Sequence, residues 1–113
     1  MAKVRVMYWK EIPIQVQAED ESGIVSRPLD SRFQEGADSI ALFDKSIGTD
    51  EYLDAWEWHE YGELEGSAED TAISVSERFN SGFPMDFVAR IRDSEARGDR
   101  KPQPGAVNHW MLG

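Results

Sequence analysis

The residues best equipped for chemistry lie close together in the middle of the chain. His59 stands between Glu57 and Glu60 with Tyr61 beside them, and His109 is the only other histidine. A histidine near carboxylates can form an acid–base pair or contribute to a metal site. No spacing specific to a metal is present, and in a strand Glu60 points away from the face of His59. We therefore expect surface histidines with no metal or cofactor, leaving His59 and His109 as weak metal candidates.

Other catalytic patterns are missing from the sequence. No glycine-rich phosphate loop follows a strand, and no nucleophile elbow is present. The chain has no cysteine, which excludes disulfides and a thiolate nucleophile. We expect no catalytic residues. The alternative is a small enzyme or cofactor-binding protein that uses His59, Glu57 and Tyr61.

The composition limits the class of partner. The 113 residues carry a net charge of −10, which argues against binding a nucleic-acid backbone. Residues 1–89 hold 19 acidic and 7 basic side chains, whereas residues 90–113 hold 3 and 5. Solubility is the simplest reason for this charge, and an acidic mimic of nucleic acid is an alternative. No apolar run approaches the 18 or so residues that cross a bilayer, so a cytoplasmic protein without a membrane partner is expected.

An aromatic-rich run, residues 52–64, must position the candidate chemical groups. Its alternation predicts a half-buried strand with Trp56, Trp58 and Leu64 on one face. His59 and Tyr61 then share the other face. Gly62 predicts a β-bulge.

Alternating residues also predict strands at the start of the chain. Residues 3–9 fit a central strand, and residues 12–19 fit a second strand with one solvated face. Gly23 suits the following turn, and Pro28 confines a short third strand from Ile24 to the edge of the sheet.

Helical spacing predicts three helices. The first begins at Asp30 or Ser31 and ends near Lys45, with Gly36 permitting close approach of a neighbour. The second begins after Ser67 and ends at Gly82. The third follows Phe83-Pro84 and ends at Gly98, and a strand over residues 86–91 is the alternative.

These elements predict an α+β fold with two layers: a mainly antiparallel sheet of about four strands packed against two or three helices. Residues 1–100 form a single domain, which includes the start of a polar linker over residues 99–105. Residues 101–113 form a docked C-terminal tail, because an apolar end on an acidic protein should pack on its own fold or on a partner.

Six residues are candidates for contact with a partner. Trp9 and Tyr61 lie opposite the main apolar sides of their predicted strands, so exposure is expected for one or both. Arg90 and Arg97 belong to the only basic cluster, although pairing with Asp86 and Asp93 within a helix is the simpler interpretation. The full set is Trp9, Trp58, Tyr61, Arg90, Arg97 and Trp110.

Four motifs give the chain a resemblance to a known family. They are Val4-Arg-Val-Met-Tyr-Trp-Lys-Glu-Ile-Pro13, Arg32-Phe-Gln34, Tyr52-Leu53 with Trp56, and Phe83-Pro84. Together they resemble the small bacterial virulence factor domain family, which is named from a conserved virulence factor that joins this domain to HEAT-like repeats. The family has no agreed activity, so the resemblance assigns no site residue. The fusion implies an adaptor role, and an association with folate-linked one-carbon enzymes implies an accessory subunit.

The sequence therefore favours a non-catalytic interaction module or small accessory subunit of a bacterial cytoplasmic complex. Its partner would be another protein subunit or a second copy of the chain. Missing catalytic motifs, surplus aromatics and an apolar C-terminus motivate this hypothesis.

Overall fold

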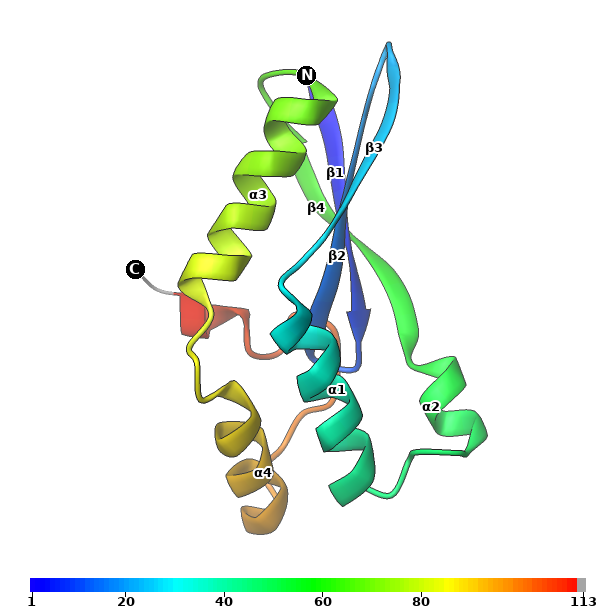
Figure 1. Ribbon diagram of the computed structural model, residues 1–113, viewed down its shortest axis with the longest axis vertical. Helices are drawn as coiled ribbons and strands as arrows, with labels where there is room; N and C mark the ends of the chain where they lie inside the picture. Colours follow the sequence, from blue (N-terminus) through cyan, green and yellow to red (C-terminus); the bar gives the residue numbers. More distant parts are fainter. Residues whose placement is uncertain (112–113) are drawn as a thin grey trace.

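A computed structural model describes residues 1–111 of the chain. Its strands form one antiparallel sheet in the order β3-β2-β1-β4, with helices against one face and one end (Figure 1). The strands are β1 (Ala2–Trp9), β2 (Ile12–Asp20), β3 (Gly23–Pro28) and β4 (Trp56–Leu64). The helices are α1 (Ser31–Phe43), α2 (Asp50–Asp54), α3 (Ala68–Gly82), α4 (Phe87–Arg97) and the 3-10 helix η1 (Asn108–Met111). The predicted α+β fold is confirmed.

The first three strands form an antiparallel meander. In β1, Val4 and Val6 are buried while Lys3 and Arg5 are exposed, because alternate side chains point to opposite faces. β1 lies in the centre, paired with both β2 and β4. Among the described strands β3 pairs only with β2, so Pro28 sits on an edge strand where no ladder donor is needed from it.

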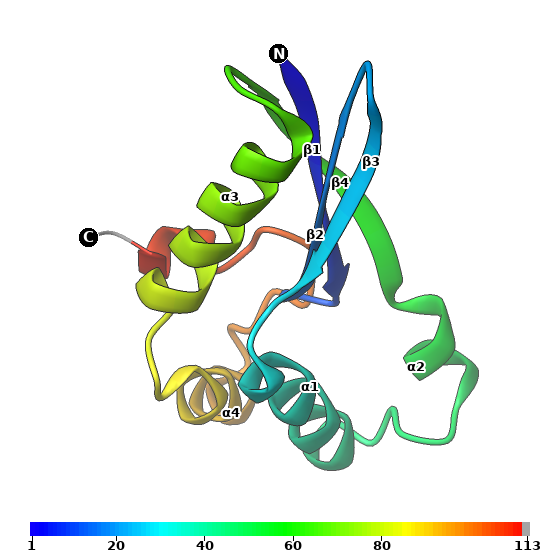
Figure 2. The same ribbon diagram turned by 45° about the horizontal axis from the view of Figure 1, so that its top comes forward.

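Helix α3 covers one face of the sheet (Figure 2). The Ser67 hydroxyl accepts a hydrogen bond of 3.1 Å from the Asp70 N–H, which confirms the predicted cap. The Asp20 carboxylate accepts another, of 2.7 Å, from the Ala68 N–H and joins the β2–β3 turn to this helix. Apolar residues at helical spacing then face the sheet. They are Ala68, Ala72, Val75 and Phe79.

Helices α1 and α4 pack closely at the end of the sheet. A Cβ on Gly36 would lie 2.4 Å from Cζ of Phe87, so only glycine lets the helices approach this far, as the sequence predicted. The Arg32 guanidinium donates to the carbonyls of Asn80 at 2.8 Å and Phe83 at 3.1 Å. It thereby satisfies the last turn of α3 and ties that turn to α1.

The predicted strand over residues 52–64 is wrong in two respects. Residues 50–54 form the short helix α2, and the strand begins only at Trp56. A bulge at Tyr61, beside Gly62 as expected, then shifts the register, because Val4 pairs with Gly62 and Arg5 with Glu60. Leu64 consequently faces the helices, on the side opposite to Trp56 and Trp58, and the prediction that the three share a face is corrected.

The α1 cap also differs from the prediction. Asp30 occupies the N-cap position, but its carboxylate accepts no hydrogen bond from the helix N–H groups. Its own N–H donates to Oδ1 of Asn80 at 2.9 Å instead. The start of α1 is therefore held by a hydrogen bond to a residue of α3. The α4 helix ends as favoured, with Gly98 left-handed at φ 80°, but it begins at Phe87 rather than at Phe83-Pro84.

The described part of the C-terminal segment packs on the domain. The Asn108 amide donates to the Tyr8 hydroxyl at 2.8 Å, Trp110 meets Phe83 edge-on at 6.2 Å, and Met111 is buried. Residues 112–113 of the predicted tail lie outside the described residues. None of the helices formed by residues 1–111 is both long and apolar enough to cross a membrane.

Candidate functional site

On one face of the sheet, the part that lies away from α2 is covered by no helix among residues 1–111, and it is the most distinctive surface of the molecule. Strand register places three pairs of β1 and β4 residues on it: Lys3 opposite Glu63, Arg5 opposite Glu60, and Met7 opposite Trp58. β2 adds Gln17, which pairs with Arg5, and Glu19, which pairs with Lys3. We call this side of the sheet the open face. It consists of Lys3, Arg5 and Met7 of β1, of Gln15, Gln17 and Glu19 of β2, and of their partners on β3 and β4; beyond Met7 it continues to Trp9 and Trp56 beside α2.

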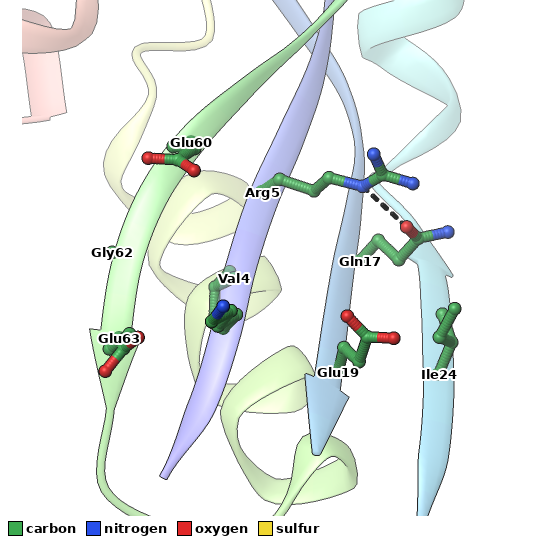
Figure 3. Close-up of a pocket in the computed structure, with 9 residues that line it drawn as sticks. Val4, Arg5, Gln17, Glu19, Ile24, Glu60, Gly62 and Glu63 are labelled. Atoms are coloured by element: carbon green, nitrogen blue, oxygen red, sulfur yellow. Dashed lines mark hydrogen bonds between the residues drawn. The ribbon is translucent and has the colours of Figure 1, made fainter. Parts of the chain in front are cut away.

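The open face is hollowed. The hollow has a volume of about 530 Å³ and spans all four strands (Figure 3). Its lining mixes cations, carboxylates and one exposed isoleucine, so it suits a polar surface better than an apolar ligand. The lining residues are Lys3, Val4, Arg5, Gln17, Glu19, Ile24, Glu60, Gly62 and Glu63.

Arg5 is held in position across the hollow. Its Nε donates to Oε1 of Gln17 at 2.6 Å, and the Gln17 amide donates to the Ser26 hydroxyl at 3.1 Å. Its guanidinium carbon also lies 4.4 Å from the ring centre of Trp58. Figure 3 shows the side chain reaching over β2, away from Glu60 on β4. Within residues 1–111, no ion pair involves Arg5, so its terminal N–H groups remain available for a partner.

Strand β4 borders this face and forms an edge of the sheet. It pairs with β1 on one side, and in the described part of the chain no strand pairs with its other side. An edge strand has alternate N–H and C=O groups pointing outward. Residues 50–65, which include α2 and β4, contain seven acidic side chains and no lysine or arginine. The edge is therefore both unpaired and strongly acidic.

The predicted aromatic contacts fall in different environments. Trp9 is fully buried, so its expected exposure is wrong: α2 folds over it, its Nε1 donates to the Tyr52 carbonyl at 3.0 Å, and the two rings lie 5.6 Å apart. Trp58 is half-buried on the open face. Tyr61 is half-buried on the helix side, 6.1 Å from the Phe79 ring, with Arg78 donating to its hydroxyl at 2.5 Å.

The predicted basic contacts lie elsewhere, on α4 and the C-terminal segment. Arg90 bonds to Asp86 at 3.0 Å and stacks over Trp110 at 5.4 Å. Arg97 bonds to Asp99 at 3.2 Å. The simpler interpretation of Arg90, pairing within the helix, is therefore observed. The six candidates do not form one surface.

The histidines show no chemical constellation. His59 shares the helix side of β4 with Glu57 and Tyr61, as predicted, and its ring lies 6.1 Å from that of Tyr8 in an edge-to-face contact. His59 and His109 are both exposed. Within residues 1–111, no group of three or more histidine, aspartate or glutamate side chains could hold a metal ion.

A buried charge network lies where the sequence predicted a linker. The Arg100 guanidinium donates two hydrogen bonds of 2.8 Å to Glu11 and one of 3.0 Å to Asp44. Lys10 donates to the same Asp44 carboxylate at 2.7 Å. The side chains of these four residues are at most 9% exposed, so the network is closed to a ligand and fastens the chain end to the β1–β2 turn.

The contacts within this network shift the pKa values of Asp44 and Arg100. Burial raises the pKa of Asp44, but hydrogen bonds from Lys10, Ser46 and Arg100 outweigh it and hold the pKa at about 2. Burial lowers the pKa of Arg100, and hydrogen bonds with Glu11 and Asp44 reverse this and raise it above its usual range. Both groups stay charged at neutral pH, as a structural clamp requires.

Sequence reasoning missed the residues that define the open face: Lys3, Arg5, Gln17, Glu19, Glu60 and Glu63. The period of two along β1 and β2 already places the first four on one face. The two glutamates share that face only because the bulge at Tyr61 changes the alternation. The pairing of β4 with β1 in the structure places Glu60 and Glu63 opposite Arg5 and Lys3.

A family model described as Virulence factor matches residues 7–91. The match includes three of the four motifs in full and most of the first, and it covers all of β2, β3, β4 and α3. The same comparisons found no match among curated proteins or among solved structures.

Proposed function

The chain belongs to the Virulence factor family, and from this premise we propose that it is a non-catalytic interaction module or small accessory subunit of a bacterial cytoplasmic complex. The open face and the adjoining β4 edge are the surface through which it acts. The partner is another protein subunit, because the surface mixes both charges with aromatic and sulfur-containing side chains.

The position of Arg5 carries this proposal. Side chains on solvated sheet faces are usually mobile, and fixing one costs conformational entropy. Here Gln17 and Trp58 hold the guanidinium over a hollow in advance. Arginine and tryptophan are the residues most enriched at the energetic centres of protein interfaces, and a preordered side chain binds at lower entropic cost.

The surrounding residues also favour a protein partner. Met7 and Trp58 are half-buried next to the charged rim, which is the usual arrangement of an apolar centre within a polar border. The hollow is lined by side chains that come from all four strands of the sheet (Figure 3). A surface of this form suits a side chain or a segment of another protein better than an enclosed small molecule.

Affinity capture from the native host tests the proposal. The tagged chain should retain a stoichiometric protein partner that mass spectrometry identifies. The variant Arg5→Ala with Trp58→Ala should lose it. A matched control, Arg92→Ala with Met85→Ala, removes one exposed cation and one exposed apolar side chain away from the open face and should retain it. Absence of a stoichiometric partner, or equal retention by both variants, would overturn the proposal.

A further inference from the structure

The charge of this molecule is concentrated beside its open edge. Residues 46–77 contain ten acidic side chains and no lysine or arginine, so their formal charge equals that of the whole chain, −10. The segment runs through α2 and β4 into α3 (Figure 1). The remaining 81 residues are neutral overall. A partner that approaches β4 therefore meets part of a strongly acidic segment of the chain.

The edge offers more than charge. β4 is nine residues long and, within residues 1–111, pairs only with β1, so its outward backbone groups can pair with another extended segment. The bulge at Tyr61 interrupts the strand and leaves Trp56 to Glu60 as its regular part. Trp56 and Trp58 are half-buried on the open face there, with Glu60 at the end of the row and Glu63 beyond the bulge.

Self-pairing of this edge is opposed by its own sequence. Glu57, Glu60 and Glu63 recur at every third position. An antiparallel pairing of two copies centred on Glu60 would place Glu60 opposite itself. Like charges directly opposite destabilise strand pairs, and charged residues on edges are a common protection against edge-to-edge association. A second copy of the chain is thus a poor occupant.

We propose that the outer edge of β4 binds an extended, lysine- or arginine-rich segment of a partner protein, which adds a strand to the sheet. Its basic side chains lie over Glu60 and Glu63 on the open face, and Trp58 stacks with a further cation. Backbone pairing supplies the strand geometry, and charge complementarity selects a basic sequence over an acidic one. This inference rests on the proposed function and specifies the class of partner.

Fluorescence anisotropy with labelled synthetic peptides tests the inference on the full chain. The probe is a peptide of the length of β4 in which lysine and valine alternate, and the comparison peptide has glutamate in place of lysine. The lysine peptide should bind and the glutamate peptide should not. Raising NaCl from about 50 to about 300 mM should weaken binding several-fold, because exposed charges are screened.

Two variants of equal charge separate the edge from the protein's overall field. Glu60→Lys with Glu63→Lys should lose at least about tenfold in affinity for the lysine peptide and gain binding to the glutamate peptide. Glu35→Lys with Asp93→Lys changes the net charge equally at exposed helical positions outside residues 46–77 and should stay within about threefold of wild type. Equal effects of the two variants would overturn the proposal.

Lysine peptides with methylated backbone nitrogens distinguish strand addition from electrostatic attraction alone. Two further lysine peptides carry N-methyl groups on either the odd or the even residues, so each keeps its charge but lacks donors along one edge. One of the two should lose binding. Unchanged binding of both, or no binding of the parent peptide, would overturn strand addition.

The remaining outcomes identify which proposal fails. Sedimentation velocity could show that the wild type is a dimer and that Glu60→Lys with Glu63→Lys is a monomer. That result would assign the β4 edge to a second copy of the chain and would overturn the proposed binding of a basic segment. A native partner captured equally by that variant and by wild type would do the same, while leaving the proposed function intact. Loss of the native partner only in Glu60→Lys with Glu63→Lys would support both.

Discussion

Replacing Arg100 by methionine tests the clamp that closes the fold. Methionine keeps much of the aliphatic volume but removes the charge, leaving the buried carboxylate of Glu11 without its cation and that of Asp44 with Lys10 alone. Their side chains are 1% and 5% exposed. Removing one partner of a buried ion pair typically costs 3–5 kcal/mol, so we expect a loss of about 4 kcal/mol and a Tm lower by roughly 10–20 °C.

The dependence of this loss on pH distinguishes a charge effect from a packing effect. The pKa of Asp44 is lowered from 3.8 to about 2, so its ionised form stabilises the fold above about pH 3.8 and this contribution disappears as the pH falls toward 2. The shift corresponds to about 2 kcal/mol. In Arg100→Met the carboxylate loses a donor and its pKa rises. The stability gap between wild type and variant should therefore narrow as the pH falls from 5 toward 2.

Urea unfolding followed by tryptophan fluorescence between pH 7 and pH 2 measures both effects. Arg97→Met is the matched control, because its ion pair with Asp99 is 61% exposed on each side and should contribute little. A loss below about 1 kcal/mol at pH 7, or a gap that is constant with pH, would refute the structural role given to Arg100.

Three further predictions concern packing and polar contacts. Gly36→Ala should destabilise the protein by about 1 kcal/mol or more in urea unfolding, because the overlap with Phe87 outweighs the better helix propensity of alanine; a stabilised variant would contradict the tight α1–α4 contact. Ser67→Ala should cost about 1 kcal/mol by the same measurement while Ser67→Asp restores most of it, and equal stability of the two variants would argue against the cap. The pKa of Tyr8 is raised by burial, partly offset by the hydrogen bond from Asn108, so the unfolded chain ionises first and stability should fall as the pH rises above about 10. Tyr8→Phe should lose less stability over that range in alkaline unfolding, and an identical decline would contradict the burial of the hydroxyl.

Much of the fold was readable from local patterns. The alternation in β1 and β2, the proline at the edge and the Ser67 cap each depend on a few neighbouring residues. Gly36 could be interpreted as a close contact because its presence inside a helix has a cost that needs a reason. Each of these features reflects local chemistry, and the structure agrees with each.

The remaining features depend on contacts between distant parts of the chain. Residues 50–54 form a helix because Tyr52 packs over Trp9, a contact across 43 positions. In the sequence Arg100 belongs to a polar segment that predicts a linker. In the fold it bonds to Glu11, which is 89 positions away. The open face follows from the pairing of β4 with β1 and from one bulge, which no local period reveals.

Amide hydrogen exchange of the chain alone and bound to its captured partner tests the central claim most directly. The outward N–H groups of β4 bond to no other strand among the described elements and should exchange quickly in the free chain. We predict that binding slows exchange most strongly over Trp56–Leu64. Slowing confined to α1, α4 or the C-terminal segment, with β4 unchanged, would contradict the account.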